Sequence, residues 1–299
     1  MSPAAYRAWG IAFAFAGVLA FSFRPIWIKL AYAAHPVSPV TLLFLRMALS
    51  LPFFAAIGWW LRRQQPRLTA RDWAALAGLG FIGYYGASFL DFLGLQYVGA
   101  GVGRLILFLF PTLVLLLSFL LLQKTPTRRE IAALVTSYAG IALVVSDQVA
   151  PGAQARLFIL GAMLIFGGAL CYAVYLVAGS QMVKRVGSMR FTAYSMTIAS
   201  IPAVVQFFAL EPLAALELPA AVWWYAIIMA SLSTVLPVFL QAEALKRIGA
   251  NHFALIGAVG PVSVAVTSAL GLDEPFGWIQ AVGALLVILG VVLVSMKRS

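Results

Sequence analysis

Apolar residues fill most of the chain in long runs that are separated by short polar segments. The pattern predicts ten apolar spans of helical length, with approximate cores at 9–31, 38–61, 73–94, 100–122, 129–146, 157–178, 191–210, 222–243, 250–270 and 277–296. Runs of about 20 apolar residues are long enough to cross a bilayer as α-helices. The weakly alternating segments of about ten residues that are typical of membrane β-barrels are absent. We therefore expect an all-α polytopic membrane protein with short connections.

The composition agrees with this class, because 63% of the 299 residues are hydrophobic and only 10% are charged. Soluble domains are roughly half apolar and about a quarter charged. The net charge of +11 would favour nucleic acid as the partner of a soluble protein. In a membrane protein, basic residues in short loops orient the helices instead, so we expect a lipid bilayer and no nucleic acid as partner. A single cysteine, Cys171, and two histidines predict neither a disulfide nor a metal site.

Lysine and arginine gather at alternate connections between the predicted spans. With the N-terminus placed in the cytoplasm, 15 of the 20 basic residues fall on the cytoplasmic side. The positive-inside rule and the even number of spans then predict that both termini are cytoplasmic. These residues are Arg7, Arg62, Arg63, Arg67, Arg71, Lys124, Arg128, Arg129, Lys184, Arg185, Arg190, Lys246, Arg247, Lys297 and Arg298.

A shift of 150 positions aligns the two halves of the chain. Between Phe89 and Leu122, 12 of 34 residues are identical to the residues 150 positions later. Pro111 falls on Pro261, and the Gly-Ala pair at position 99 falls on the pair at position 249. We interpret the chain as two five-span repeats, residues 1–150 and 151–299.

Because five is an odd number of spans, the second repeat is expected to lie upside down relative to the first. Inverted repeats are typical of secondary transporters, whose substrate site lies between the halves near the bilayer midplane. Two equivalent halves can exchange conformations, which is the basis of alternating access. The expected architecture is therefore two inverted five-helix repeats around a central cavity, and the expected function is secondary transport of a small molecule.

The same features carry a family resemblance. The chain resembles the drug/metabolite transporter superfamily, EamA type, in its duplicated five-helix unit, its Gly-Ala pairs, its glycine-rich third span and the Asp273-Glu274-Pro275 turn before the tenth span. Within that superfamily it looks most like bacterial exporters of aromatic amino acids, the YddG type. The resemblance implies export of amino acids, or of related amphipathic metabolites or drugs, across a bacterial inner membrane without an obligate protein partner. It also implies that spans three, four, eight and nine line the cavity, with spans one and six nearby.

Charged residues inside the predicted spans are candidate functional residues, because charges are costly in a bilayer. Asp91 and Arg104 lie at similar distances from the turn between spans three and four. They could form a structural ion pair, or Arg104 could bind a substrate carboxylate while Asp91 positions it. Arg24 and Arg46 share a depth in spans one and two, although Arg46 could instead donate to backbone groups that Pro25 leaves free. We assign Arg24, Arg46 and Asp91 to a polar network.

Aromatic and hydroxyl residues cluster in the spans that the resemblance places around the cavity. The segment FIGYYGASF of span three has glycines at 80, 83 and 86, and such small residues allow close helix packing. An aromatic pocket would suit an aromatic side chain or an organic cation, although ordinary core packing uses the same residues. Together with Arg104, the candidates for substrate binding are Trp27, Tyr84, Tyr85, Ser88, Phe108, Tyr172, Tyr175, Ser233 and Thr234.

Three prolines and one amide are candidates for gating. Pro237 in span eight has no counterpart in span three and is a candidate hinge. Pro111 and Pro261 mark equivalent sites in spans four and nine. Gln241 aligns with Asp91 under the 150-residue shift, so one gate would use an amide where the other uses a charge.

The start of span nine differs from the start of span four. Asn251 and His252 stand where the first half has glycine and valine, and Ala254 stands where it has Arg104. Glu243 could exchange protons with His252, or it could form a surface pair with a neighbouring lysine or arginine. The two gates are therefore expected to be chemically unequal.

Two rival functions remain, a channel or facilitator for another small metabolite and an intramembrane enzyme. Membrane enzymes need paired acids, a Ser–His pair or a metal site, whereas the acids here are scattered and His35 and His252 lie toward opposite faces. The sequence GAGVG lacks the strand and acidic residue of a dinucleotide-binding loop, and no Walker motif occurs. We expect no enzyme activity, no cofactor and no ATP-driven transport.

Overall fold

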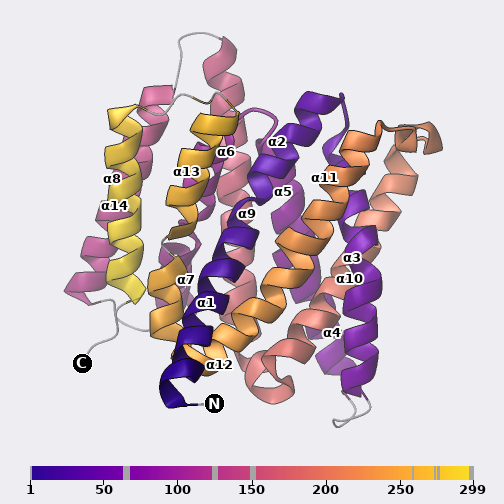
Figure 1. Cartoon of the computed structure of the whole chain (residues 1–299), viewed down its shortest axis with the longest axis horizontal. Helices are drawn as coiled ribbons and strands as arrows, with labels where there is room; N and C mark the ends of the chain where they lie inside the picture. Colours follow the sequence, from indigo (N-terminus) through magenta and orange to yellow (C-terminus); the bar gives the residue numbers. More distant parts are fainter. Residues whose placement is uncertain are drawn as a thin grey trace.

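The computed structural model describes residues 2–62, 68–122, 127–148, 153–257, 259–272, 274 and 277–295. These residues form helices and connections without a β-strand among them, which confirms the all-helical class. The helices lie side by side in one bundle (Figure 1). Among the described residues, eight helical segments are long and apolar enough to cross a membrane, and two shorter apolar helices lie at Val259–Gly271 and Trp278–Leu293.

The first half of the chain forms the helices that correspond to the first five predicted spans. They are α1 (Pro3–Ser22), α2 (Arg24–Ala34), α3 (Pro39–Arg62), α4 (Ala70–Gly80), η1 (Phe81–Gly86), α5 (Ala87–Gly94), α6 (Ala100–Leu107), α7 (Phe110–Leu122) and α8 (Arg128–Gln148).

The second half repeats much of this order, with one long helix in place of α1 and α2. Its elements are α9 (Ala153–Val186), α10 (Ser188–Leu210), η2 (Leu213–Leu216), α11 (Ala220–Ala230), η3 (Ser231–Val235), α12 (Leu236–Gly257), α13 (Val259–Gly271) and α14 (Trp278–Ser295).

Prolines account for two helix boundaries in the first half of the chain. A proline cannot donate the hydrogen bond to the carbonyl four residues earlier, and α6 ends at Leu107, four residues before Pro111. Pro25 stands in the first turn of α2, where its missing donor is tolerated, so the single span predicted at 9–31 is two helices instead.

The predicted boundary between spans eight and nine differs from the structure. Span nine was expected to open at Gly249 and Ala250, as span four opens at Gly99 and Ala100. Both residues instead lie within the bounds of α12, and α13 begins at Val259. One physical difference between the two places is that α6 has a carboxylate from another part of the chain at its first amides, as described below.

Two π-helical turns interrupt the α-helices at equivalent places. The first, η1, begins at Phe81 and joins α4 to α5, and the second, η3, begins at Ser231 and joins α11 to α12. A π-turn inserts an extra residue into the helix and is frequent at functional sites. Pro237 follows η3 closely, but η1 forms without such a proline, so the candidate hinge is not what creates the turn.

Glycines allow the helices to approach each other closely. A Cβ atom on Gly80 would lie 2.7 Å from the carbonyl oxygen of Ser195, and one on Gly83 would overlap the side chain of Tyr175. These glycines therefore bring the third predicted span against α10 and α9, as the small-residue pattern predicts. In Figure 1, α8 lies beside α14 and α3 beside α10.

Candidate functional site

A cavity of about 380 Å³ lies inside the bundle, between elements of both halves. Its size is that of a site for one small organic molecule. Its lining residues include three arginines, hydroxyl groups and a large share of aromatic and aliphatic side chains. They are Val18, Phe21, Arg24, Arg46, Gly83, Tyr84, Ala87, Ser88, Arg104, Leu107, Phe108, Phe110, Tyr172, Leu176, Met196, Ser233, Thr234, Pro237, Val238, Gln241, Phe253 and Gly257.

The two π-turns contribute equivalent positions to the cavity wall. Gly83 and Tyr84 of η1 line it, and so do Ser233 and Thr234 of η3, which lie 150 residues later. Because the wider turn changes the direction in which the following side chains leave the helix, both π-turns shape the same space from opposite halves of the chain.

Arg46 of α3 connects three elements at the cavity. Its Nε donates to Thr234 Oγ1 of η3 at 3.2 Å, and its Nη1 donates to Ser88 Oγ of α5 at 3.2 Å. The guanidinium also lies over the ring of Phe92, 5.6 Å from its centroid. The residue is 2% exposed. The structure thus gives Arg46 side-chain partners rather than the backbone groups freed by Pro25.

Asp91 of α5 pairs with Arg24 of α2 rather than with Arg104. Arg24 Nη2 donates to Asp91 Oδ2 at 2.7 Å, and both side chains are buried. Arg104 of α6 instead donates from Nη2 to Ser22 Oγ at 3.0 Å. The helix break at Phe23 explains why Asp91 pairs with Arg24 and not with Arg104. Ser22, at the end of α1, contacts Arg104 of α6, and Arg24, at the start of α2, contacts Asp91 of α5.

Two of the guanidinium groups share an aromatic neighbour. The ring centroid of Phe21 lies 5.2 Å from Cζ of Arg24 and 4.9 Å from Cζ of Arg104. Contacts of this kind stabilise a cation over the negative face of the ring. The Nε atoms of both arginines are buried and have no hydrogen-bond partner, so their donors are incompletely satisfied within the described chain.

The structure brings many, but not all, of the predicted substrate-binding residues to the cavity. Tyr84, Ser88, Phe108, Tyr172, Ser233 and Thr234 line it together with Arg104. Tyr175 packs its ring on Tyr84 with centroids 4.9 Å apart and lies behind the wall. Trp27 stacks on Tyr225 of α11 at 6.3 Å, and Tyr85 stacks on Phe89 at 6.2 Å. These last three are packing residues in this structure and are not part of the cavity lining.

The predicted gating residues are divided between the cavity and other places. Pro237 and Gln241 line the cavity. Glu243 accepts from Nε and Nη2 of Arg247 at 3.0 and 2.9 Å, which is the surface-pair interpretation. The side chains of Asn251 and His252 lie outside the described part of the chain.

Several cavity residues were missed by the sequence reasoning. Phe21 and Phe253 are aromatic residues within apolar runs and give no separate signal. Met196 is equally unremarkable alone, but it stands 150 residues after Arg46 and could have been found from the repeat. Ser22 could have been found as a hydroxyl two residues before a buried arginine.

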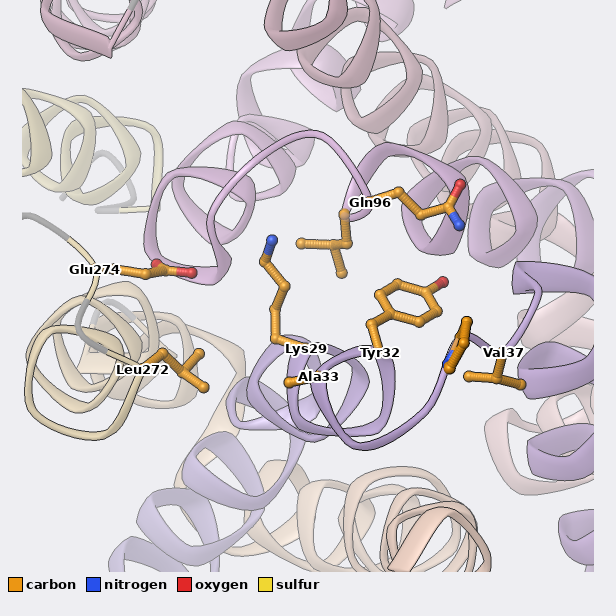
Figure 2. A pocket seen from close by; sticks show the side chains of 9 residues that line it. Lys29, Tyr32, Ala33, Val37, Gln96, Leu272 and Glu274 are labelled. Atoms are coloured by element: carbon orange, nitrogen blue, oxygen red, sulfur yellow. The ribbon is translucent and has the colours of Figure 1, made fainter. Parts of the chain in front are cut away.

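A second cavity, of about 480 Å³, lies at the end of the bundle opposite the N-terminus. Figure 2 shows Lys29 and Tyr32 of α2 in its wall, with Glu274 on one side and Gln96 on the other. Of the Asp273-Glu274-Pro275 turn, only Glu274 lies within the described residues. This pocket was not predicted, although Glu274 belongs to a motif that the sequence singled out.

Glu274 binds the first amides of α6 at this end of the bundle. Its Oε1 accepts from the N–H of Ala100 at 2.6 Å, and its Oε2 accepts from the N–H of Gly101 at 3.1 Å. A carboxylate at a helix N-terminus satisfies free donors and the helix dipole together. A Cβ on Gly99 would lie 2.8 Å from Glu274 Oε2, so the glycine permits the approach.

Residues 8–146 and residues 159–296 each match the model of the EamA-like transporter family. The chain is similar to the uncharacterized transporter YcbK of Bacillus subtilis, with 31% identity over 281 residues, 92% of this chain and 88% of that protein. It is also similar to an uncharacterized transporter of Archaeoglobus fulgidus, with 26% identity over 277 residues, 91% of this chain and 92% of that protein.

Two further similarities are more limited. The threonine/homoserine exporter RhtA of Escherichia coli (strain K12) is 31% identical over 133 residues, which is 42% of each chain. A solved crystal structure covers 95% of both chains with a TM-score of 0.64 at 18% identity. The latter similarity shows a shared fold.

Proposed function

Because the chain belongs to the EamA-like transporter family, we propose that it is a secondary transporter that exports amino acids, aromatic and other neutral ones, by alternating access. Related amphipathic metabolites or drugs are further cargo in this proposal. The observation that carries it is the buried cavity, in which guanidinium groups meet aromatic and hydroxyl side chains. A guanidinium binds a carboxylate in a planar, bidentate geometry, and the apolar wall suits a side chain.

The similarity to an amino acid exporter supports this class of cargo. RhtA is named as an exporter of threonine and homoserine, and its similarity to this chain extends over 133 residues. The aromatic part of the cargo, which the YddG-type resemblance implies, is supported by Tyr84, Phe108 and Tyr172 in the cavity wall.

Alternating access requires two halves that can exchange roles, and contacts between the halves support that arrangement. A Cβ on Gly140 of α8 would lie 2.6 Å from the carbonyl oxygen of Gly283, and one on Gly290 of α14 would lie 2.6 Å from that of Ala133. Gly290 and Gly283 follow Gly140 and Ala133 by 150 residues. Such reciprocal contacts are the signature of a two-fold interface, so we propose residues 1–150 and 151–299 as inverted repeats.

We further propose a bacterial inner membrane location with both termini in the cytoplasm. The positive-inside rule carries this orientation. It would put the pocket of Lys29 and Glu274 at the outer end of the bundle, since that pocket lies opposite the N-terminus (Figure 1).

Counterflow in proteoliposomes tests the proposal. Purified protein is reconstituted into vesicles preloaded with phenylalanine, tryptophan, threonine, glutamate or a quaternary ammonium compound, and labelled uptake is followed. A carrier of amino acids gives saturable uptake that preloading with a neutral amino acid accelerates. Uptake that rises linearly with concentration, without acceleration by preloading, would indicate a channel instead.

A further inference from the structure

The charges of the central cavity do not balance. Arg24, Arg46 and Arg104 line it and are 7%, 2% and 5% exposed. Asp91 neutralises one of them, Arg24, at 2.7 Å. The hydrogen bonds of Arg46 go to neutral hydroxyls, and the hydrogen bond of Arg104 also goes to a hydroxyl. Two buried guanidinium groups therefore lack a carboxylate partner among the described residues.

Unbalanced buried charge is expensive, particularly within a membrane. An anion between the guanidinium groups would supply the missing charge and accept the donors that are left over, since each guanidinium has five N–H donors. A bound carboxylate would have Arg46 and Arg104 available to it while Arg24 keeps its pair with Asp91.

An ammonium group would find no negatively charged partner in the cavity. None of the described residues that line the cavity is an aspartate or glutamate. Asp91 is 1% exposed and its carboxylate is held by Arg24. An α-ammonium could reach only hydroxyl and amide oxygens, such as those of Ser233 and Gln241, and the guanidinium groups would repel it.

The rest of the wall accepts an apolar body. Phe108, Phe110, Leu176 and Phe253 line the cavity around the polar groups. A cargo that fills about 380 Å³ would therefore combine an apolar or aromatic part with a negatively charged head.

We propose that the cavity selects cargo of net negative charge, an amphipathic organic acid whose carboxylate is not balanced by an ammonium group. This inference rests on the proposed transport function and narrows its cargo. N-acylated amino acids and simple aromatic carboxylates belong to the favoured class. Free neutral amino acids are carried less well, and organic cations are excluded.

Three probes that share one side chain test the role of charge alone. N-acetylphenylalanine is an anion, phenylalanine is a zwitterion and phenylalaninamide is a cation near neutral pH. Each is measured as labelled cargo and as competitor in proteoliposomes that contain the whole protein, and the threonine series serves as a second set with a smaller side chain. We expect the anion to half-saturate transport at a concentration at least about 10-fold lower than the zwitterion, because contacts between the ammonium group of the zwitterion and the guanidinium groups are strongly unfavourable. The cation should neither exchange nor compete.

Two variants connect the selectivity to the cavity. Arg104→Gln removes one unbalanced charge and should reduce the preference for the anion, whereas Arg104→Lys retains the charge and should retain most of the preference. Lys246→Gln is the matched control, because Lys246 is an exposed cation outside the cavity lining. Size-exclusion chromatography and thermal denaturation identify variants that are not folded, and the comparison of probes on the unaltered protein remains decisive if a variant fails.

The outcomes separate this inference from the proposed function. Equal or better exchange of phenylalanine relative to N-acetylphenylalanine would overturn the charge selectivity and leave amino acid transport in place. Absence of exchange for every probe in both series, with folded protein, would overturn the transport of this cargo class as well.

Discussion

The two halves of the chain repeat much of the same order of helices and differ in charge. Arg46 in the first half and Met196 in the second occupy equivalent positions, and both line the central cavity. The same holds for Tyr84 and Thr234 in the two π-turns. The halves are therefore alike in the position of their π-turns and unlike in the side chains that line the cavity. We infer that recognition of the cargo depends mainly on the first half.

The backbone features and the charged side chains of the two halves have different physical causes. The π-turns and the break before Pro111 act through the backbone, regardless of the side chains around them. Charged side chains carry no such structural requirement. The residues equivalent to Arg24, Asp91 and Arg104 are Val174, Gln241 and Ala254, so each buried charge of the first half has a neutral counterpart in the second.

The largest effect is expected from removing Asp91, the buried acid that pairs with Arg24. Asp91→Asn leaves Arg24 buried without its carboxylate, and breaking a buried pair in this way costs about 3–5 kcal/mol of stability. The double variant Arg24→Gln, Asp91→Asn removes both charges and should cost less than the single one. Thermal and denaturant unfolding in detergent measure this, with the exposed Asp147→Asn as control. A single variant as stable as the unaltered protein would contradict a structural role for the pair.

Arg46→Met gives the first half the residue that the second half has at the equivalent position. The change removes two hydrogen bonds of a charged group, to Ser88 and Thr234, and one of the cavity's positive charges. We expect transport of a carboxylate cargo to fall by about 100-fold, since the hydrogen bond that the cargo would make to the charged Arg46 contributes about 1.5–3 kcal/mol. Initial counterflow rates measure this, and Met196→Leu is the control in the other half. Retained transport by Arg46→Met would contradict a role in cargo recognition for the difference between Arg46 and Met196.

Much of the fold was predictable because it depends on local and periodic signals. The apolar runs predicted the helices, whereas the break before Pro111 that divides the fourth predicted span into α6 and α7 was not predicted. Depth made an ion pair between Arg104 and Asp91 one of two alternatives, and this alternative was wrong, because Asp91 pairs with Arg24. Such a partner depends on the rotation of one helix relative to another, which the spacing of residues along the chain does not encode.

The sequence predicted which types of residue form the candidate site better than it predicted which individual residues line the cavity. Arg24, Arg46 and Arg104 are conspicuous within apolar spans, and all three line the cavity. Aromatic residues are common throughout the chain, so Trp27 and Tyr175 could not be distinguished from Tyr84 by sequence. Glu274 binds the start of α6 from a position 173 residues beyond Gly101, and a contact so distant along the chain has no sequence signal.

Gly83→Ser also exchanges a residue for its counterpart, Ser233. A side chain at Gly83 would overlap Tyr175, so η1 and α9 would have to separate. Overpacking of this kind costs about 1–3 kcal/mol, and the thermal midpoint in detergent should fall accordingly. Gly78→Ser in α4, within the same predicted span, is the matched control, because nothing lies within 4 Å of a Cβ there. Equal midpoints for the two variants would mean that the close packing at Gly83 is not required.

The smallest effect is expected at the end of the bundle, where the halves differ once more. Glu274 holds the first amides of α6, while the residue 150 positions earlier is Lys124, whose ammonium has no acceptor. Glu274→Gln keeps one acceptor oxygen but removes the charge at the helix N-terminus, which is worth about 0.3–1 kcal/mol. We expect this end to open more often, and Lys29→Cys in a Cys171→Ser background should then react faster with a membrane-impermeant maleimide. Glu217→Gln, an exposed acid between α10 and α11, provides the control. If labelling at position 29 is equally fast with glutamate and with glutamine at position 274, the carboxylate satisfies the helix end without keeping this entrance closed, and the asymmetry between the halves is confined to the central cavity.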